Sequence, residues 1–429
     1  MNRVRFLLLF FLALSLATAH AQVSDLQFAA TLGEELFQNS GATGMVLVIV
    51  RDNQVFFHGY GETAPGSHTL PTQDSVIRIC SLTKIFTTDV LAKLAADKTV
   101  RLTDPLQRYA PPRTIVPRRV ESRSILPITL EDLATHTSGL PRELGTAPRG
   151  TPHFTFPDRA TRWRWLPNQK LKPTPGTVAL YSNVAFDLLS DALASATHQQ
   201  YAALLAERTL NPLHMRNTTY FPNAVQCSRL LQGFHDGGAC TSTEQTAGSS
   251  GLYSTAGDMA IWLQYLLSDS TLAQDPSAQS VYLQPSNLIR QQGLDHAGVP
   301  SGIGLGWIHL LPADSPSHII EKTGGGAGFQ TYIAINHPHH TAIFLAATDG
   351  PGRQSQAISG SNAPNQEAPV PQTPHLNLFY GANNLLAAVA GFPPPPPPPI
   401  RKAKAKGTPI RKRAAQAHHR RQKRGRSEK

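Results

Sequence analysis

A serine and a lysine three residues apart, Ser81 and Lys84, are the residues best suited to do chemistry in this 429-residue chain. In a helix, positions i and i+3 lie on one face, so the Lys84 amine can reach the Ser81 hydroxyl and help to remove its proton. A serine hydroxyl needs such a base before it attacks a carbonyl group. Because both residue types are common, this spacing arises by chance about once or twice in a chain of this length. The pair is therefore a candidate nucleophile and base that needs support from other motifs.

Two short motifs follow this pair in an order typical of penicillin-recognising acyl-transfer sites. They are Tyr181-Ser182-Asn183 and Lys322-Thr323-Gly324. Tyr181 is a candidate proton shuttle, because a tyrosine held between two cationic amines loses part of its usual pKa of about 10. A core aromatic side chain is the alternative interpretation of this tyrosine. The three ordered motifs make chance a poor explanation for the pairing of Ser81 with Lys84.

The remaining motif residues are candidates for substrate binding. Asn183 offers a donor and an acceptor to a substrate amide, and a helix cap is the structural alternative. The Lys322 ammonium and the Thr323 hydroxyl suit a terminal carboxylate, whereas a solvated lysine at a strand end is the simpler interpretation. The N–H groups of Gly325 and Ser81 are candidates for an oxyanion hole, with a loose glycine-rich turn as the alternative.

Two longer segments join these motifs in resembling a known family. They are His136-Thr137-Ser138-Gly139-Leu140-Pro141 and Ser250-Gly251-Leu252-Tyr253-Ser254-Thr255-Ala256-Gly257-Asp258-Met259. Together these residues resemble the serine β-lactamase and penicillin-binding superfamily, on its class C-like side. The resemblance runs from about residue 43 to 390. Leu102-Thr103-Asp104-Pro105-Leu106, the histidine-containing loop and a mid-chain cysteine pair make the chain most similar to periplasmic D-alanyl-D-alanine carboxypeptidase/endopeptidases.

The resemblance implies a serine hydrolase that forms an acyl ester on Ser81 and needs no cofactor. The implied partners are peptidoglycan stem peptides and β-lactams, with DD-peptidase activity first and a weak β-lactamase activity beside it. Three alternatives stay open: a class C-like β-lactamase, a serine esterase of the same fold that would tolerate loss of Lys322, and a non-catalytic penicillin-binding sensor. The intact motifs argue against the sensor. Peptidase and β-lactamase differ in how fast water removes the acyl group, which the sequence does not reveal.

Hydrophobic patterns place strands at both ends of the chain around a helical middle. The expected strands cover residues 45–50, 55–60, 304–310, 318–322, 330–335 and 341–347, and the expected helices cover 25–38, 84–98, 129–135, 184–196, 199–208, 256–268 and 375–390. This order predicts an α/β (α+β) fold with one antiparallel sheet from both chain ends, flanked by helices. The resemblance implies that this fold is of the β-lactamase/transpeptidase type. A mostly helical domain would be inserted at about 85–290 within a catalytic domain over 22–391, with a long loop over 350–373.

The first 21 residues have the pattern of a cleaved signal peptide. A basic start precedes an apolar run from Phe6 to Ala17, and Ala19-His20-Ala21 has the small-x-small form of a cleavage site. The apolar run is shorter than the roughly 20 residues that span a bilayer, which argues against a membrane anchor. We therefore expect export to the periplasm, with cleavage near Ala21.

The formal net charge of +11 is concentrated at the end of the chain. Residues 401–429 hold 13 of the 39 Lys and Arg residues and a single acidic residue, Glu428. Seven prolines over 393–399 precede them, so residues 392–429 are expected to form a disordered polyproline and basic tail. The body is nearly neutral and predicts no nucleic-acid partner, while the tail is either an unpartnered appendage or a contact to anionic membrane or cell-wall surfaces.

The three cysteines exclude a disulfide-rich scaffold and a four-cysteine zinc site. Cys227 and Cys240 are the candidate disulfide, which would stabilise the fold by about 3 kcal/mol, and two free thiols are the alternative. Cys80 is expected to be a small buried residue. Asp258 and His136 are interpreted as structural, and no metal site is expected because no histidine motif has ligand spacing.

Overall fold

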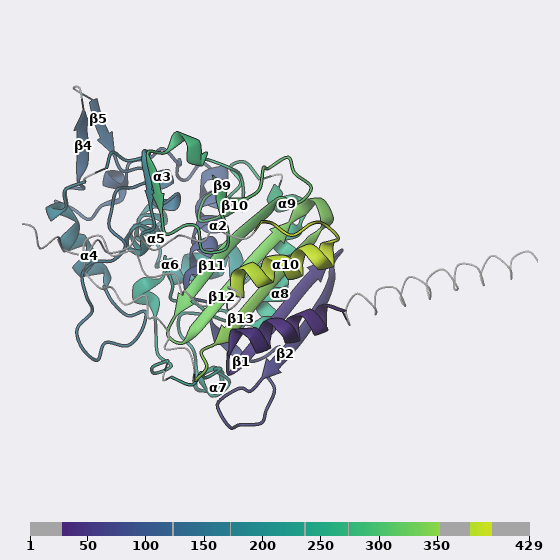
Figure 1. The fold of residues 1–429 in the computed structure, drawn as a ribbon. Coiled ribbons are helices and arrows are strands. Elements are labelled where there is room, and N and C mark those ends of the chain that lie inside the picture. The colour runs from purple at the N-terminus through teal and green to yellow at the C-terminus, as the bar shows by residue number, and fades with distance from the viewer. Residues whose placement is uncertain are drawn as a thin grey trace, which may run out of the picture. The chain divides into compact units, whose positions relative to one another are not determined.

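Strands from the first and the last part of the described chain join in one sheet, as the sequence predicts (Figure 1). The computed structural model describes residues 28–351 and 378–396, apart from residues 122, 123, 172, 236 and 273. The signal peptide expected over 1–21, the basic segment over 401–429 and most of the loop expected over 350–373 lie outside the described residues.

Seven antiparallel strands lie in the order β2-β1-β13-β12-β11-β10-β9. Their bounds are β1 (Gly44–Arg51), β2 (Gln54–Gly61), β9 (Pro300–Ile303), β10 (Ile308–Leu310), β11 (Ile319–Gly326), β12 (Phe329–Asn336) and β13 (Thr341–Thr348). Asp52 and Asn53 join β1 to β2 with φ values of 49° and 66°, a left-handed backbone that Asp and Asn tolerate in a two-residue hairpin turn. Because β1 pairs with β13, the first and last strands of the described sequence are neighbours within the sheet.

The sheet separates two hydrophobic cores, and β1 contributes to both. Val46, Val48 and Val50 belong to one core, while Met45 and Leu47 belong to the other. Successive side chains of a strand point to opposite faces, so a continuous apolar run is required where both faces are covered. This explains why the sequence of β1 does not alternate between polar and apolar residues.

Helices cover each face of the sheet (Figure 1). The helix over residues 28–40 and α10 (Leu378–Ala390) lie on one face, where α10 packs on β12 and β13. On the other face, α8 (Ala256–Leu267) packs on β1 and β13, and the segment that leads into α2 (Thr83–Ala96) packs on β11. Among the described helices, none has the length and apolar character needed to span a bilayer.

All remaining elements except η7 lie between β2 and β9 in the sequence, a region that includes the helical insertion expected at about 85–290. Its helical segments are η1 (Cys80–Leu82), η2 (Leu106–Tyr109), α3 (Leu130–Ala134), α4 (Arg159–Trp165), η3 (Leu166–Asn168), α5 (Asn183–Thr197), α6 (Tyr201–Leu205), η4 (Ala206–Leu210), α7 (Ala224–Ser228), η5 (Glu244–Thr246), α9 (Asp269–Leu272) and η6 (Pro285–Asn287). Its strands are β3 (Val76–Arg78), β4 (Arg118–Glu121), β5 (Ser124–Pro127), β6 (Val178–Leu180), β7 (Tyr253–Thr255) and β8 (Arg290–Gln292), and η7 (His337–His339) joins β12 to β13.

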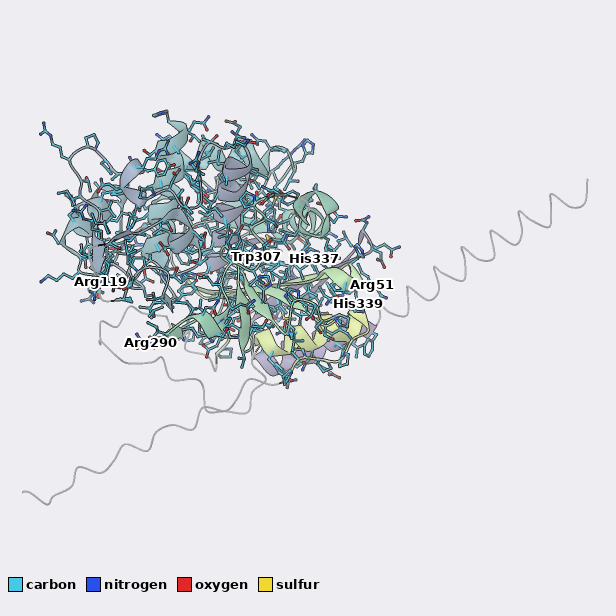
Figure 2. All side chains as sticks on the ribbon, turned by 90° about the horizontal axis from the view of Figure 1, so that it is seen from above. Arg51, Arg119, Arg290, Trp307, His337 and His339 are labelled. Atoms are coloured by element: carbon cyan, nitrogen blue, oxygen red, sulfur yellow. A yellow bond between two sulfur atoms is a disulfide. The ribbon has the colours of Figure 1, made fainter. Side chains whose placement is uncertain are left out.

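The prediction of a single strand over residues 304–310 was wrong, because only Ile308–Leu310 of this range form a strand, β10. The chain turns between β9 and β10, where the Gly304 N–H donates to the Trp307 carbonyl at 2.9 Å and Gly306 has a φ of 75°. The Gly306 N–H donates to the Ala134 carbonyl of α3 at 2.8 Å. Trp307 is buried where the sheet meets the helical insertion (Figure 2). The turn thus ties the sheet to the insertion, which apolar composition alone does not reveal.

The body of the protein extends past residue 391, the boundary expected from the sequence. Phe392 is only 7% exposed and belongs to the core beneath α10. The Tyr380 hydroxyl donates to the Pro395 carbonyl at 3.1 Å. The first residues assigned to the tail are therefore part of the folded body, because an aromatic side chain and a carbonyl there have partners in it.

We predict that truncation after Pro396 leaves stability unchanged, whereas truncation after Gly391 lowers the free energy of unfolding by about 3 kcal/mol or more. The shorter chain loses the buried Phe392 ring, and removing such a ring leaves a cavity. Urea unfolding of the two truncated proteins and the full chain measures the difference. Equal midpoints for all three would contradict the burial of Phe392.

Glu321 is a buried carboxyl group on β11, next to Lys322 but on the opposite face of the strand. It is 2% exposed, and its Oε2 atom has no hydrogen-bond partner among the described residues. Burial raises the pKa of Glu321 to about 8, although the charge of Lys322 lowers it in part. The carboxyl group is therefore protonated in the folded protein near neutral pH.

We predict that Glu321→Gln stabilises the protein at alkaline pH and has little effect at pH 5. The unfolded chain ionises Glu321 near its ordinary pKa, so stability is lost as the pH rises towards the folded-state pKa, by roughly 1.4 kcal/mol for each pH unit between the two values. Glutamine keeps the shape and cannot ionise. Thermal unfolding at pH 5 and pH 9 measures this, with the exposed Glu207→Gln as control. A stability change of the same size at both pH values would show that charge is not the cause.

Candidate active site

Ser81 lies in η1, between β3 and the first turn of α2. Cys80, just before it, has a φ of 52°, so the chain bends sharply ahead of the serine. The Thr331 hydroxyl of β12 donates to the Ile79 carbonyl at 2.9 Å, which ties this bend to the sheet. The serine is therefore fixed where a helix begins beside the last strands of the chain.

Gly324 makes the close approach of η1 to β11 possible. A Cβ atom at this position would lie 3.0 Å from the Ile79 carbonyl oxygen and 3.0 Å from Leu82 Cδ1, and it would collide with the Thr331 hydroxyl. The glycine of the Lys-Thr-Gly motif thus has a packing role: it lets the strand that carries Lys322 lie against the segment that carries Ser81.

Lys84 is fully buried, and each of its three N–H donors has an acceptor. Its Nζ atom donates to Ser81 Oγ at 3.3 Å, to Asn183 Oδ1 at 2.6 Å and to the Ser249 carbonyl at 2.7 Å. Burial lowers the pKa of Lys84, an effect that nearby Tyr181 opposes and Lys322 reinforces. The amine is thus closer to giving up a proton than an exposed lysine would be.

Tyr181 lies between β6 and α5 with positive charges around its ring. Lys84 Nζ and Lys322 Nζ each lie 4.9 Å from the ring centroid, and Arg142 Cζ lies 4.6 Å from it. Burial by itself raises the pKa of Tyr181, but these three cations and a hydrogen bond with Ser81 lower it to about 7. A tyrosine that loses its proton near neutral pH and touches Ser81 can act as a base.

His136 braces the turn that carries Tyr181. Its Nδ1 atom accepts a hydrogen bond from the Ser182 N–H at 3.0 Å, and its ring stacks on the Tyr181 ring at 4.4 Å. Burial and the neighbouring cations hold the pKa of His136 well below its usual range. The ring is therefore neutral and acts as an acceptor, in agreement with the structural role expected from the sequence.

The other predicted substrate-binding residues lie on two elements beside Ser81. Asn183 begins α5, and its side chain bridges Lys84 and Glu143, since Asn183 Nδ2 donates to a Glu143 carboxylate oxygen. Lys322 is 2% exposed and lies on β11, followed by Thr323 and Gly325 on the same strand. The structure thus brings three predicted residues, Ser81, Lys84 and Tyr181, together with residues of α5 and β11.

Four further residues of this site were not predicted. Arg142 and Glu143 contact Tyr181 and Asn183, Ser249 accepts from Lys84, and Asp187 is buried nearby. Burial raises the pKa of Asp187 to about 7, while Arg162 lowers it in part. A signal for Arg142 and Glu143 was available, because they directly follow the His-Thr-Ser-Gly-Leu-Pro loop. The Ser249 carbonyl left no signal, since any residue supplies one.

The cysteines lie outside the reactive centre. Cys80 is buried beside Ser81, and burial raises the pKa of its thiol to about 12, so it is not a nucleophile at neutral pH. Cys227 and Cys240 form a disulfide. Arg78 of β3 donates to the carbonyls of Gly238 and Ala239 at 2.8 and 2.9 Å, which fixes the disulfide-closed loop to the strand that leads into η1.

Asp258 has a structural role. Its Oδ2 atom accepts hydrogen bonds from the Asn217 N–H and from the Thr218 hydroxyl, both at 2.8 Å. These bonds hold the loop between η4 and α7 against the first turn of α8. Within the described residues, no group of three or more His, Cys, Asp or Glu side chains could hold a metal ion.

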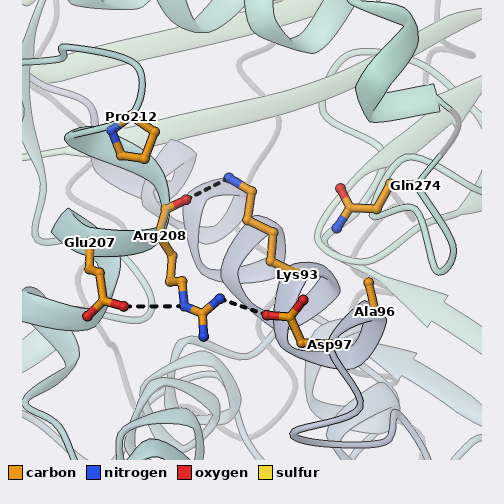
Figure 3. A pocket seen from close by; sticks show the side chains of 7 residues that line it. All are labelled: Lys93, Ala96, Asp97, Glu207, Arg208, Pro212 and Gln274. Carbon is orange, nitrogen blue, oxygen red and sulfur yellow. Dashed lines mark hydrogen bonds and ion pairs between the residues drawn. The ribbon is translucent and has the colours of Figure 1, made fainter.

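A hollow of about 460 Å³ near the C-terminal end of α2 is separate from this centre (Figure 3). Its charged side chains pair with their neighbours. Arg208 Nη1 lies 2.7 Å from Asp97 Oδ2, and Lys93 Nζ donates to the Arg208 carbonyl at 3.0 Å. Lys93 is nine residues beyond Lys84, about 14 Å along the helix. The hollow therefore has no part in chemistry at Ser81.

The chain is similar to several known proteins. A family model described as Beta-lactamase matches residues 29–361. The D-alanyl-D-alanine-carboxypeptidase/endopeptidase AmpH of Escherichia coli K12 is 42% identical over 348 residues, which are 79% of this chain and 89% of AmpH. A solved β-lactamase/D-alanine carboxypeptidase from Yersinia pestis, complexed with citrate, matches with a TM-score of 0.75 at 39% identity and covers 86% of this chain and 99% of its own.

A class C β-lactamase from Rhodobacter sphaeroides shares the fold, with a TM-score of 0.58 at 20% identity over 75% of this chain and 94% of its own. The predicted fold class and superfamily are thus confirmed, and so is the similarity to carboxypeptidase/endopeptidases. The matched residues include both the site around Ser81 and the sheet beside it, and this chain therefore belongs to the β-lactamase family.

Proposed function

We propose that this chain is a periplasmic serine D-alanyl-D-alanine carboxypeptidase and endopeptidase that acts on peptidoglycan stem peptides. The observation that carries the proposal is Tyr181, which hydrogen-bonds to Ser81 while the cations of Lys84 and Lys322 lie against its ring. The E. coli relative supports the choice of substrate, because its name describes this activity. Export fits the same proposal, with the signal peptide removed near Ala21.

In the first step, Ser81 Oγ attacks the carbonyl carbon of the penultimate D-alanine and its proton passes to Tyr181. The carbon–nitrogen bond then breaks, and the proton moves from Tyr181 to the leaving amine. Lys84 stabilises the tyrosinate through its charge. A water molecule completes the cycle: its oxygen attacks the acyl ester, and one of its protons returns to Ser81 as the ester bond breaks.

The remaining motif residues hold the peptide during these steps. The Lys322 ammonium and the Thr323 hydroxyl bind the terminal carboxylate of the substrate, and Asn183 binds an amide of the peptide. The N–H groups of Ser81 and Gly325 stabilise the negative oxygen of the tetrahedral intermediate, each contributing about 3 kcal/mol to the lowering of the barrier.

Hydrolysis of β-lactams is a second candidate activity, because the Yersinia pestis structure is described as a β-lactamase as well as a D-alanine carboxypeptidase. A β-lactam acylates the same serine, and a rapid attack by water would turn the inhibitor into a substrate. An esterase would not need a cation at position 322. The Lys322 side chain is buried against the Tyr181 ring, and this cation in the site favours a substrate with a carboxylate. A sensor without catalysis is disfavoured by a site in which Tyr181, the proposed base, is already hydrogen-bonded to Ser81, the proposed nucleophile.

Incubation with a labelled penicillin, and separately with muropeptides, tests this function. We expect a long-lived adduct on Ser81 and release of D-alanine, both found by mass spectrometry. Ser81→Ala should abolish both, because it removes the nucleophile and leaves Lys84 and Asn183 paired. Rapid hydrolysis of penicillin without any cleavage of muropeptides would favour the β-lactamase instead.

The rate of acylation should rise with pH through a midpoint near 7, where Tyr181 loses its proton. The tyrosinate is the base, so the acid limb of the profile reports its ionisation. Tyr181→Phe should lower the rate by roughly 100-fold to 10,000-fold, the usual contribution of a general base, and should remove that limb. Stopped-flow acylation by a chromogenic cephalosporin between pH 5 and 9 measures both. If the acid limb of the pH profile is unchanged in Tyr181→Phe, the ionisation that it reports belongs to another group.

A further inference from the structure

Two charged residues that no predicted motif includes, Arg142 and Glu143, lie against the residues that would transfer the proton and bind the substrate. We propose that Arg142 is a third cation for the Tyr181 anion and that Glu143 is its counterion and fixes the Asn183 amide, so that both act as positioning residues of the reaction. This inference rests on the function proposed above and adds two residues to it.

Arg142 is at least as close to the tyrosine as either motif lysine. Its Cζ atom lies 4.6 Å from the Tyr181 ring centroid, compared with 4.9 Å for Lys84 Nζ and for Lys322 Nζ. A guanidinium over an aromatic face is attracted to the ring and still more to its anion. Gly293 leaves room for this arrangement, because a Cβ atom there would lie 3.2 Å from Tyr181 Cβ and 4.0 Å from Arg142 Nη1.

The Arg142 side chain contacts the site through the Tyr181 ring and Glu143. Its Nε atom is buried without a hydrogen-bond partner among the described residues, and it lies 3.8 Å from Glu143 Oε1. The side chain is 33% exposed, so it is not a core residue. By contrast, the buried guanidinium of Arg162 is paired with the Asp191 carboxylate.

Tyr181 is surrounded by few other groups that could supply or cancel charge. Lys84 comes from α2, Lys322 from β11 and Arg142 from the loop after α3. His136 stacks on the ring, but burial holds its pKa well below the usual range, so it adds no charge near neutral pH. Burial also lowers the pKa of His296, which lies near Arg142 and Lys322.

Glu143 and Asp187 are acidic groups near these cations; Glu321 lies beside Lys322 on the opposite face of β11, and Asp295 acts on His296. Burial raises the pKa of Glu143 and of Asp187, that of Asp187 to about 7, and the charge of Lys84 opposes the effect in each case. Glu143 is the one that contacts Arg142. Removing the charge of Arg142 should therefore make the Tyr181 anion harder to form, and removing the charge of Glu143 should make it easier.

Glu143 also determines which way the Asn183 amide points. A carboxylate only accepts hydrogen bonds, so Asn183 must turn Nδ2 towards Glu143 and Oδ1 towards Lys84. A single N–H of Nδ2 is used by Glu143, and the second can be offered to a substrate carbonyl. An asparagine without this acceptor would be free to rotate.

The test is the pH profile of Ser81 acylation by a chromogenic cephalosporin in four variants of the full chain. Arg142→Gln should move the acid limb up by about one pH unit, so the rate falls about tenfold at pH 6 and hardly at pH 9. Arg142→Lys should restore most of the wild-type profile. Glu143→Gln, which retains an acceptor for Asn183, should move the limb to lower pH. Arg164→Gln on α4, whose side chain bonds to Thr161, is the matched control and should not move it.

A second readout follows the tyrosine itself. Each variant is also made with Tyr181→Phe added. The difference in phenolate absorbance between the two proteins gives the ionisation midpoint of Tyr181 without any substrate. Thermal unfolding verifies that the variants fold. If Arg142→Gln does not fold, Arg142→Lys and Glu143→Gln still test the inference.

Opposite shifts for Arg142→Gln and Glu143→Gln are the expected result in both measurements. A uniform loss of rate at all pH values, with the Tyr181 midpoint unchanged, would overturn the inference and leave the pair a purely structural role. Wild-type protein that is not acylated at all would instead refute the proposed function, so the two failures are distinguishable.

Discussion

The site depends on the burial of one ammonium group. An isolated cation in a protein interior costs many kcal/mol, and Lys84 avoids this cost because its three donors reach three different segments. Ser81 lies in the turn before its own helix, Asn183 begins α5, and Ser249 follows η5. The bonds that satisfy the lysine are therefore also those that bring Ser81, the proposed nucleophile, and the Asn183 amide, proposed to bind substrate, to one place. Removing one of the acceptors would leave a buried N–H of Lys84 unpaired, at a cost in stability.

Strand β11 of the sheet forms the opposite wall of the site. On β11, Lys322 faces the site while Glu321 faces the core beneath α10, because side chains alternate along a strand. An ionisable residue on each face of a buried strand is tolerated, because burial keeps Glu321 protonated and uncharged near neutral pH while the Lys322 ammonium interacts with the Tyr181 ring. Gly324 then lets β11 lie close enough to η1 for that lysine to reach the tyrosine.

The sequence predicted the parts of this arrangement that local patterns determine. The order of the three motifs indicated Ser81, Lys84 and Tyr181, since helical spacing and motif order need no knowledge of distant contacts. Arg142 was missed because its partner is 39 positions away and its contact forms only when the loop after α3 meets the turn before α5. The Gly304–Trp307 turn and the burial of Phe392 were missed for a related reason: composition suggested a strand and a linker, and packing decided otherwise.

A tyrosine with a pKa near 7 suits a reaction in which the same group must take a proton and return it. A stronger base would hold the proton when the amine leaves, and a weaker one would not remove it from Ser81. Three cations against one buried ring achieve this balance, because burial alone would raise the pKa and the charges reverse that effect. Peptidase and β-lactamase chemistry share this first step. Their difference must therefore arise after acylation, in how readily water reaches the Ser81 ester while Tyr181 is free to receive its proton.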